Sequence, residues 1–186
     1  MLSVELFGFC QFNTQHSTFH IMKDLFPALE YFTQLAADNR LASEQGFYPC
    51  LCSGPDSIDG VMQGFKKHRN FIMVDDTTSQ QTFSNGVGFF RRDVYTVFIL
   101  AGYRADDMTD RETKLNMCRT LFRQFHSRLL HNREELGDER LTFLDLHNVY
   151  SNELPRYSYN GVTGLYFMIR NEQPIDISYD RAEWVK

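Results

Sequence analysis

The sequence predicts an α+β fold: a mostly antiparallel sheet of about four strands, with a long helix packed across it and an N-terminal helix. Three observations support this prediction. Residues 89–103 are typical of a long strand, because an uncharged run of β-branched and aromatic side chains fills most of them. A highly charged turn follows and starts an amphipathic helix. Two further strand-like runs come after that helix, and another helical pattern precedes the sheet.

The N-terminal helical pattern covers residues 17–43. Its apolar residues recur at spacings of three and four: Leu25, Leu29, Phe32 and Leu35. Asp24 is a suitable cap for a helix whose early turn contains Pro27, where proline is tolerated. One longer helix kinked at Pro27 is the alternative. Residues 1–12 fit a strand or a helix equally well.

Glycine and proline punctuate residues 44–70, so we expect a long connection or insertion there, with a short helix near 57–65. Residues 71–83 are typical of a strand with a polar end. The dipeptide Asn85-Gly86 follows, and both residues accept positive φ at low cost. The sequence therefore predicts a hairpin that pairs this strand with the long one.

The strand at 89–103 carries uncharged side chains on both faces. One face has Val94, Thr96, Phe98 and Leu100, and the other has Tyr95, Val97, Ile99 and Ala101. Such a strand is expected to be central and covered on both sides. A helix layer would cover one face, and a neighbouring subunit would cover the other.

The charged turn after this strand is a helix start. Thr109 and Glu112 form a capping-box pattern, and Asp110 adds negative charge at the positive end of the helix dipole. One apolar stripe then continues over roughly 20 to 25 residues. Its members are Leu115, Cys118, Phe122, Phe125 and Leu129. Gly137 ends this region.

Two more strands are predicted at 141–150 and 161–170, with a Tyr-rich loop between them and a polar tail at 171–184. The 186 residues suit one domain, 1–186, with enough length to bury a core. Aromatic residues make up 15%, which is typical of a folded chain. The net charge of −5 argues against a protein that wraps nucleic acid by its overall field.

The chain is expected to be soluble and made in a reducing cytoplasm. Its four cysteines suggest no disulfide framework. Residues 1–12 have no basic region and no small-residue cleavage site, and they include Glu5, so they do not resemble a signal peptide. No apolar run reaches the roughly 20 residues that a membrane span needs.

The sequence contains no catalytic motif. Cys50 and Cys52 lack the further ligands that a zinc site needs. Asp75 and Asp76 lie at a strand end, where a divalent-metal nuclease would place carboxylates, but no companion base or phosphate loop is visible. A second acidic cluster at 106–110 has a simpler role at the helix start. We therefore predict no catalytic residue, no metal site, no cofactor and no enzyme.

Arginines line the side of the long helix that lies opposite its apolar stripe, and Arg119 and Arg123 are two of them. A solvated helix face is the favoured interpretation because the whole chain is acidic. The alternatives are a nucleic-acid stripe and pairing with acidic loops of a neighbouring subunit. Arg91 and Arg92, at the start of the central strand, fit the pairing with a subunit.

The order of helix, two strands, long helix and two strands resembles the tail-terminator family of tailed bacteriophages and related head–tail connection proteins. The resemblance covers 17–43, 71–104, 109–133 and 141–170, and the section GLYFMIRNEQPIDISYDRAEW is similar to the closing strand and tail of such proteins. The segment 44–70 is a long insertion relative to the simplest members. The resemblance implies a structural virion protein of the tail or neck, made in the bacterial host cytoplasm. It would form a ring, commonly a hexamer, that closes the tail tube and joins it to the head connector.

The resemblance also implies partners and contact residues. The ring would contact the tail tube protein and the head connector or neck proteins, and DNA would pass through its acidic lumen without specific binding. The hairpin at 76–88 and the loop at 150–161 would reach neighbouring subunits. The predicted contact residues are Asp75, Asp76, Arg91, Arg92, Arg119, Arg123, Tyr150, Arg156, Tyr157 and Tyr159.

Other functions also fit the sequence. One is a monomeric module that binds a ligand or partner in an apolar pocket between the long helix and the sheet. Another is a metal-dependent hydrolase whose site assembles from scattered residues such as Asp75, Asp76 and His147. A neighbouring head–tail connector of similar topology fits the same element order.

Overall fold

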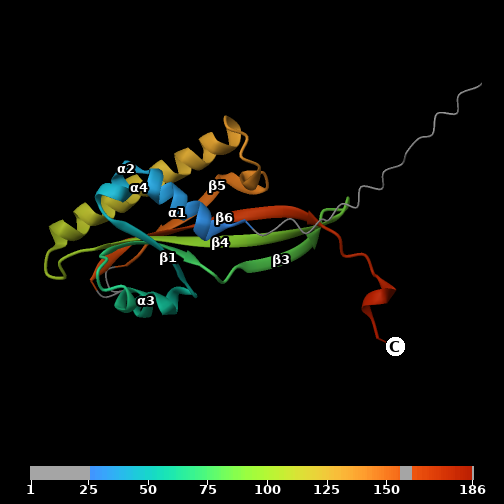
Figure 1. The fold of residues 1–186 in the computed structure, drawn as a ribbon, viewed down its shortest axis with the longest axis horizontal. Helices are drawn as coiled ribbons and strands as arrows, with labels where there is room; N and C mark the ends of the chain where they lie inside the picture. Colours follow the sequence, from blue (N-terminus) through green and yellow to red (C-terminus); the bar gives the residue numbers. More distant parts are fainter. Residues whose placement is uncertain (1–25, 156–160, 186) are drawn as a thin grey trace, which may run out of the picture.

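The computed structural model describes residues 26–155 and 161–185. A six-stranded sheet lies at its centre, with helices on both faces (Figure 1). The described α-helices are α1 (Ala28–Asp38), α2 (Arg40–Glu44), α3 (Ile58–Gly64) and α4 (Met108–Glu134). α1, α2 and α4 cover one face of the sheet, and α3 lies on the other. The predicted mixed fold, with a mostly antiparallel sheet and a long helix, is confirmed.

The sheet has the order β1-β2-β4-β6-β5, and β3 pairs with β4 outside this path. Its strands are β1 (Phe47–Cys52), β2 (Asn70–Asp75), β3 (Ser79–Ser84), β4 (Phe89–Gly102), β5 (Leu144–Glu153) and β6 (Val162–Ile175). β1 and β2 run parallel, and the other described pairs are antiparallel. The central β4 pairs with β6 over its whole length, while β2 and β3 share its other edge.

The prediction of about four strands is too low, because the sheet has six. One added strand is β1, which lies within 44–70, where the sequence predicts a connection. Pro49 is compatible with β1 because this strand lies at the sheet edge. The other arises because residues 76–78 break the predicted strand 71–83 into β2 and β3. The short helix expected near 57–65 is present as α3.

The predicted helix at 17–43 forms two helices within the described residues, because the chain turns at Asn39. Asn39 has an extended backbone, and its side chain accepts a hydrogen bond of 2.9 Å from a backbone N–H of α2, which caps that helix. Pro27 is the N-cap residue of α1 rather than a kink inside it. The prediction for 1–12 and the proposed cap Asp24 fall outside the described residues.

α4 is a helix of 27 residues that crosses the sheet. Asp107 is its N-cap, and the Asp107 side chain accepts a hydrogen bond of 2.9 Å from the N–H of Asp110. The predicted capping box at Thr109 is therefore wrong, since the helix has already begun at Met108. Phe122 of the predicted stripe is only partly buried. The buried stripe is Leu115, Cys118, Leu121, Phe125 and Leu129.

Apolar side chains form one cluster on each face of the sheet. The larger cluster joins α1 and α4 to β4 and β6, and the ring of Phe32 lies 5.6 Å from that of Phe167. The smaller cluster lies beneath α3, where Ile58 packs with Phe71 and Phe98. Both clusters meet β4, so its C-terminal half is buried on both sides, as the sequence predicts.

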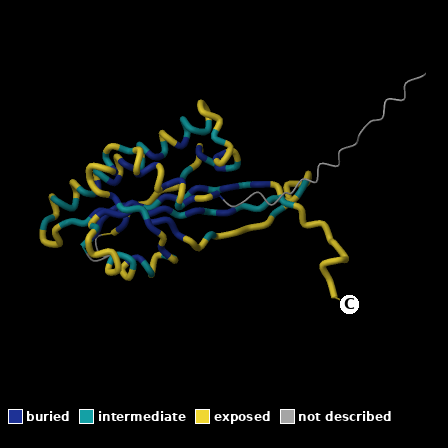
Figure 2. Tube along the Cα trace, viewed as in Figure 1, coloured by how far each residue is buried: buried dark blue, intermediate teal, exposed yellow. Residues whose placement is uncertain are grey.

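The sheet continues beyond its helices as an arm (Figures 1 and 2). The arm consists of β3, the N-terminal half of β4 and the C-terminal end of β6. Its tip is the predicted turn: the Asn85 side chain accepts hydrogen bonds from the N–H groups of Val87 and Gly88, and Gly86 has a φ of 87°. Within this chain the C-terminal half of β4 is covered on both faces, while Val94 and Thr96 in its N-terminal half stay half-exposed; their cover by a neighbouring subunit remains a prediction.

Beyond β6, residues 176–185 leave the sheet as an exposed tail (Figure 2). Within the described part of the chain, no helix has both the length and the apolar character of a membrane span.

Candidate assembly surface

The face of the sheet that carries α3 is covered over β1, β2 and the C-terminal half of β4, and the described residues leave the rest of it open. Side chains of β3, β4, β5 and β6 share this open part through their pairing register. They are half-buried or exposed, and Tyr150 has 54% of its surface accessible. We call this surface the open face and define it by Phe83, Phe90, Arg92, Val94, Thr96, Tyr150 and Met168.

At the arm end of the open face, aromatic and charged side chains contact one another. The rings of Phe83 and Phe90 stack with centroids 5.8 Å apart. The guanidinium of Arg92 lies 4.7 Å from the centroid of the Phe83 ring, and its Nε lies 2.5 Å from Oε1 of Glu172. The guanidinium of Arg92 is thus held over the ring of Phe83. Arginine and aromatic side chains in such arrangements are typical anchors of protein interfaces.

The opposite face of the arm has different chemistry. Asp93 is fully buried, and its Oδ2 accepts a hydrogen bond of 3.0 Å from Nε of Arg91. Oδ1 of Asp93 has no hydrogen-bond partner among the described residues. A buried carboxylate is costly unless it is paired, so the guanidinium of Arg91 stabilises the fold of the arm. This role makes Arg91 a poor candidate for pairing with a neighbouring subunit.

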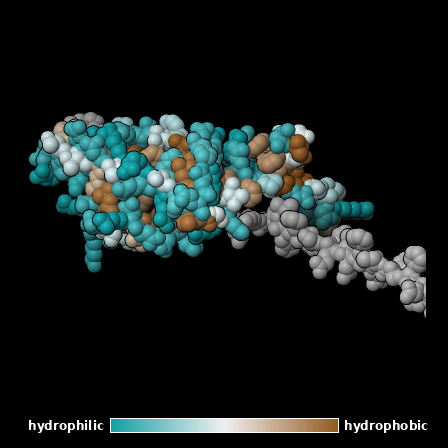
Figure 3. All heavy atoms as spheres, turned by 90° about the horizontal axis from the view of Figure 1, so that it is seen from above, coloured by the Kyte–Doolittle hydropathy of each residue, from teal (hydrophilic) through white to brown (hydrophobic). Residues whose placement is uncertain are grey.

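The tip of the arm is apolar. Val87 is 93% exposed and Phe89 is 46% exposed. Seen from the helix side, brown apolar surface gathers again at the arm, away from the brown patches of the body (Figure 3). An exposed valine and phenylalanine at a protruding turn are able to bury apolar area only against another chain or another part of this one.

The two predicted acidic contacts have different surroundings. Asp75 is buried, and its Oδ1 accepts hydrogen bonds from the N–H of Gly54, the N–H of Thr77 and the hydroxyl of Thr77, at 2.9, 2.9 and 2.6 Å. These bonds fix the loops that follow β1 and β2, so Asp75 has a structural role. Asp76 is exposed and remains a candidate contact.

The two predicted arginines of α4 also differ. Arg119 binds Glu153 of β5 through two hydrogen bonds of 2.6 and 2.8 Å. This pair raises the pKa of Arg119 and lowers the pKa of Glu153 below its usual range. Arg123 is exposed and makes no ion pair within the described residues. The remaining predicted contacts, Arg156, Tyr157 and Tyr159, lie outside the described residues.

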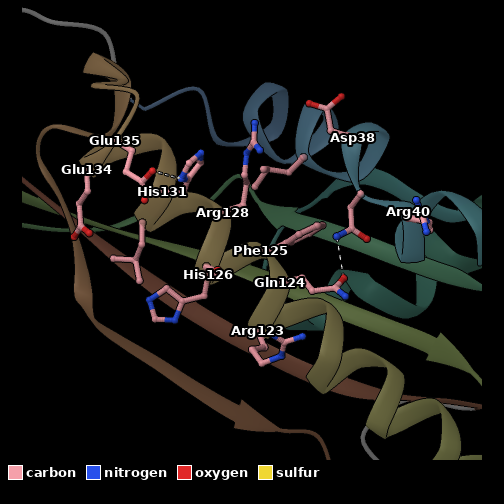
Figure 4. Close-up of a pocket in the computed structure, with 14 residues that line it drawn as sticks. Asp38, Arg40, Arg123, Gln124, Phe125, His126, Arg128, His131, Glu134 and Glu135 are labelled. Atoms are coloured by element: carbon pink, nitrogen blue, oxygen red, sulfur yellow. Dashed lines mark hydrogen bonds and ion pairs between the residues drawn. The ribbon is translucent and has the colours of Figure 1, made fainter.

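A hollow of about 790 Å³ lies between α1–α2 and α4, on the outer side of the helix layer (Figure 4). Three arginines and three carboxylates line it: Arg40, Arg123, Arg128, Asp38, Glu134 and Glu135. Asn39 and Gln124 bridge it with a hydrogen bond of 2.9 Å. Between α4 and the sheet, by contrast, Cys118 and Phe125 pack within the larger apolar cluster. The hollow therefore has a mixed lining and lies outside the helix layer, whereas a binding module was expected to have an apolar pocket between the long helix and the sheet.

The predicted hydrolase residues do not meet. Asp75 ends β2 and His147 lies on β5, three strand spacings away, which is about 14 Å. Nε2 of His147 lies 3.2 Å from Oε1 of Glu134, on the helix side of the molecule. Among the described residues, no group of three His, Cys, Asp or Glu side chains is placed to hold a metal ion.

The three described cysteines are buried and free. Burial raises the pKa of Cys50 to about 11 and the pKa of Cys118 to about 12. Their thiolates are therefore disfavoured, and these side chains are core or edge-strand residues, as the sequence suggests. Cys10 lies outside the described residues.

Sequence reasoning missed part of the open face. Phe83, Phe90 and Met168 belong to the open face but are not among the predicted contact residues, although Met168 alternates with buried residues along β6. The period-2 pattern contains that signal, but it does not show which alternating face the helices leave open. In comparisons with known proteins, neither a family model nor a curated protein matches the chain.

Proposed function

We propose that this protein is a structural virion component that assembles into a ring, of the kind formed by tail terminators. The ring, most simply a hexamer, closes the tail tube and joins it to the head connector. The tail tube protein and the connector or neck proteins are its partners. DNA passes through the ring without specific binding, since the chain carries a net charge of −5.

The observation that carries the proposal is the arm with its open face. One sheet is buried between helix layers at one end and continues at the other as an arm, one face of which the described residues leave uncovered. The uncovered end carries a fixed arginine, stacked aromatic rings and an apolar tip. A neighbouring copy would cover it, and repetition of this contact closes a ring if the rotation between copies is right.

The first experiment is negative-stain electron microscopy together with sedimentation velocity on the purified protein at high concentration. We expect closed rings of one size. A double variant, Val94→Lys with Met168→Glu, should leave monomers because it places charge in the centre of the open face. The matched control is Arg123→Glu with Arg128→Glu, which changes charge on the exposed side of α4 and should leave the rings intact.

Circular dichroism would show that the double variant is still folded. If the double variant still forms rings, the open face is not part of the interface between copies. A wild-type chain that stays monomeric throughout would contradict the ring itself. The same fold and surface also suit a neighbouring head–tail connector, and a cryo-EM map of virions would separate the two positions.

A monomeric partner-binding module is the second candidate. The hollow between α1–α2 and α4 favours it, because three arginines and three carboxylates line it beside apolar side chains. A partner that co-purifies with the wild-type protein and is lost from the Arg123→Glu, Arg128→Glu variant would support this function.

A further inference from the structure

The end of the sheet opposite the arm carries a groove of about 660 Å³. It lies where β2 and β6 begin and β4 ends, beside α3. Its charged lining has three cations, Lys66, Arg69 and Arg104, and one carboxylate, Asp59. Apolar surface of Met62 and Tyr103 lies between these charges. We call this site the basic groove.

The basic groove has an excess of unpaired positive charge. Lys66 and Arg69 are exposed, and neither forms an ion pair with another described residue. Arg104 is partly neutralised, since its guanidinium lies 2.5 Å from Oδ2 of Asp107. A smaller hollow that shares Arg69 and Arg104 with the groove adds one further cation, Lys114, and one carboxylate, Asp110. In a chain with a net charge of −5, such a site favours an anionic ligand.

The exposed tail at 176–185 has the complementary character. Its carboxylates are Asp176, Asp180 and Glu183, against one cation, Arg181. Its large apolar side chains are unusually open: Ile177 is 50% exposed, Tyr179 73% and Trp184 65%. The rings of Tyr179 and Trp184 stack with centroids 6.0 Å apart, and the Asp180 side chain accepts a hydrogen bond from the N–H of Ala182.

We propose that the tail of one copy docks in the basic groove of the next copy. The carboxylates of Asp176 and Asp180 pair with Lys66 and Arg69, and the Trp184 ring packs on apolar surface of the groove. This inference rests on the proposed assembly and names one of its contacts. Burial of exposed aromatic area beside charge pairs is the usual composition of an interface centre and rim.

The tail cannot reach the groove of its own chain. β6 runs from the groove at Val162 to Ile175, and its 14 residues span about 43 Å. From Ile175, a fully extended chain reaches Trp184 after about 32 Å. The contact must therefore be between copies. It joins opposite ends of the molecule (Figure 1), which is the head-to-tail arrangement that a ring requires.

The test uses a fluorescent peptide of residues 174–185 and full-length protein as receptor. The receptor carries Asp180→Lys and Trp184→Ala, so that its own tail does not compete. Fluorescence anisotropy should show saturable binding that weakens as salt is raised. Lys66→Glu with Arg69→Glu should weaken binding at least tenfold. A peptide with Asp176→Lys and Asp180→Lys should bind that variant better than the wild-type groove.

The matched control is Arg40→Glu with Arg123→Glu, which makes the same change of charge in the hollow of the helix layer. It should leave peptide affinity unchanged. Equal binding by the groove variant and the wild-type groove, or no binding at all, would overturn the proposal. A groove that binds duplex DNA but not the peptide would also overturn the proposal, because its cations would then bind phosphates.

Electron microscopy separates this contact from the ring. Rings formed by protein lacking residues 176–186 would overturn the tail contact and leave the proposed function intact. Peptide binding in a protein that forms only open chains would support the contact and contradict the closed ring.

Discussion

The two halves of β4 belong to one strand but have different surroundings. Val97, Ile99 and Ala101 are fully buried beneath the helix layer, and Phe98 and Leu100 are buried on the α3 side. In the N-terminal half, Arg91, Arg92 and Val94 remain half-exposed. The hydrogen-bond ladder with β6 is continuous across both halves. Pairing alone therefore does not decide which half is core, and the extent of the helices does.

The comparison shows how one sheet is able to serve two purposes. The body buries enough apolar area to fold, since side chains close both faces. The arm keeps the same backbone ladder and leaves the side chains of its open face for other contacts. Substitutions in the body should therefore change the free energy of unfolding, while those on the open face should change association.

The largest effect is expected at Gly164 in the body. A Cβ atom there would lie 2.0 Å from the carbonyl oxygen of Ile99 on β4, and Gly164 has a φ of 155°. Gly164→Ala would push β6 away from the strand to which it is bonded. We expect insoluble protein or a loss of about 4 kcal/mol or more, because backbone cannot move aside like a side chain. Soluble expression and urea unfolding measure this effect.

Gly60→Ala is the matched control. Nothing lies within 4 Å of a Cβ at Gly60, which is in the middle of α3. Alanine should stabilise the protein by up to about 1 kcal/mol through its helix propensity. If the Gly164→Ala protein is as stable as this control, β6 is able to move away from β4 in the body without loss of stability.

A smaller effect is expected from a phenylalanine in the body. Phe167 is 1% exposed, and its ring lies 5.0 Å from Phe122 and 5.6 Å from Phe32. Phe167→Ala should lower the free energy of unfolding by about 3–5 kcal/mol. In the arm, Phe90→Ala should cost less than about 1.5 kcal/mol, because one side of its ring is open. If urea titrations give Phe167→Ala and Phe90→Ala equal losses in the free energy of unfolding, the distinction between body and arm is wrong.

The sequence predicts the elements whose pattern is local. The strand at 89–103, the helix that became α4 and the Asn85-Gly86 turn each follow from a period or a dipeptide. β1 could not be predicted in the same way, because a parallel partner lies far along the chain and Pro49 weakens the strand pattern. The break between β2 and β3 depends on the hydrogen bonds of Asp75, which a sequence does not display.

The candidate surface was predictable only in part. Arg92 and Tyr150 belong to the open face, and their residue types suggested an interface. Asp75 and Arg119 instead bind groups of their own chain, because tertiary folding brings Gly54 and Glu153 beside them, and Arg91 binds Asp93, which lies two residues further along the same strand. Which face of a strand stays open depends on where the helices end, and no local pattern specifies that position.

The third effect concerns the buried thiol of Cys118 in the body. Its pKa is raised to about 12, whereas an exposed thiol has a pKa near 9.0. The folded state thus keeps the proton, and the stability of the protein is complete below pH 9 and falls as pH rises towards 12. Between pH 8 and pH 10 the free energy of unfolding should fall by about 1.4 kcal/mol more in the wild type than in Cys118→Val. If the free energy of unfolding changes with pH in the same way in both proteins, the Cys118 thiol is not shielded from solvent.

The smallest effect is expected at a surface ion pair that joins α4 to the outer strand of the body. Arg119 and Glu153 join α4 to β5, and both side chains are nearly half exposed. The pKa of Glu153 is lowered, so the pair stabilises the folded state above the usual glutamate pKa near 4.5, and this contribution is lost as pH falls below that value. Solvent screens exposed pairs, so Glu153→Gln should cost at most about 0.5 kcal/mol at pH 7, and less at pH 3 or in high salt. Arg123→Gln, which removes an arginine without an ion pair, should cost nothing at either pH.

A loss above about 1 kcal/mol for Glu153→Gln would mean that β5 depends on charge more than on packing. The outer edge of the body would then resemble the arm, where Arg92 and Glu172 hold neighbouring strands together in the same way.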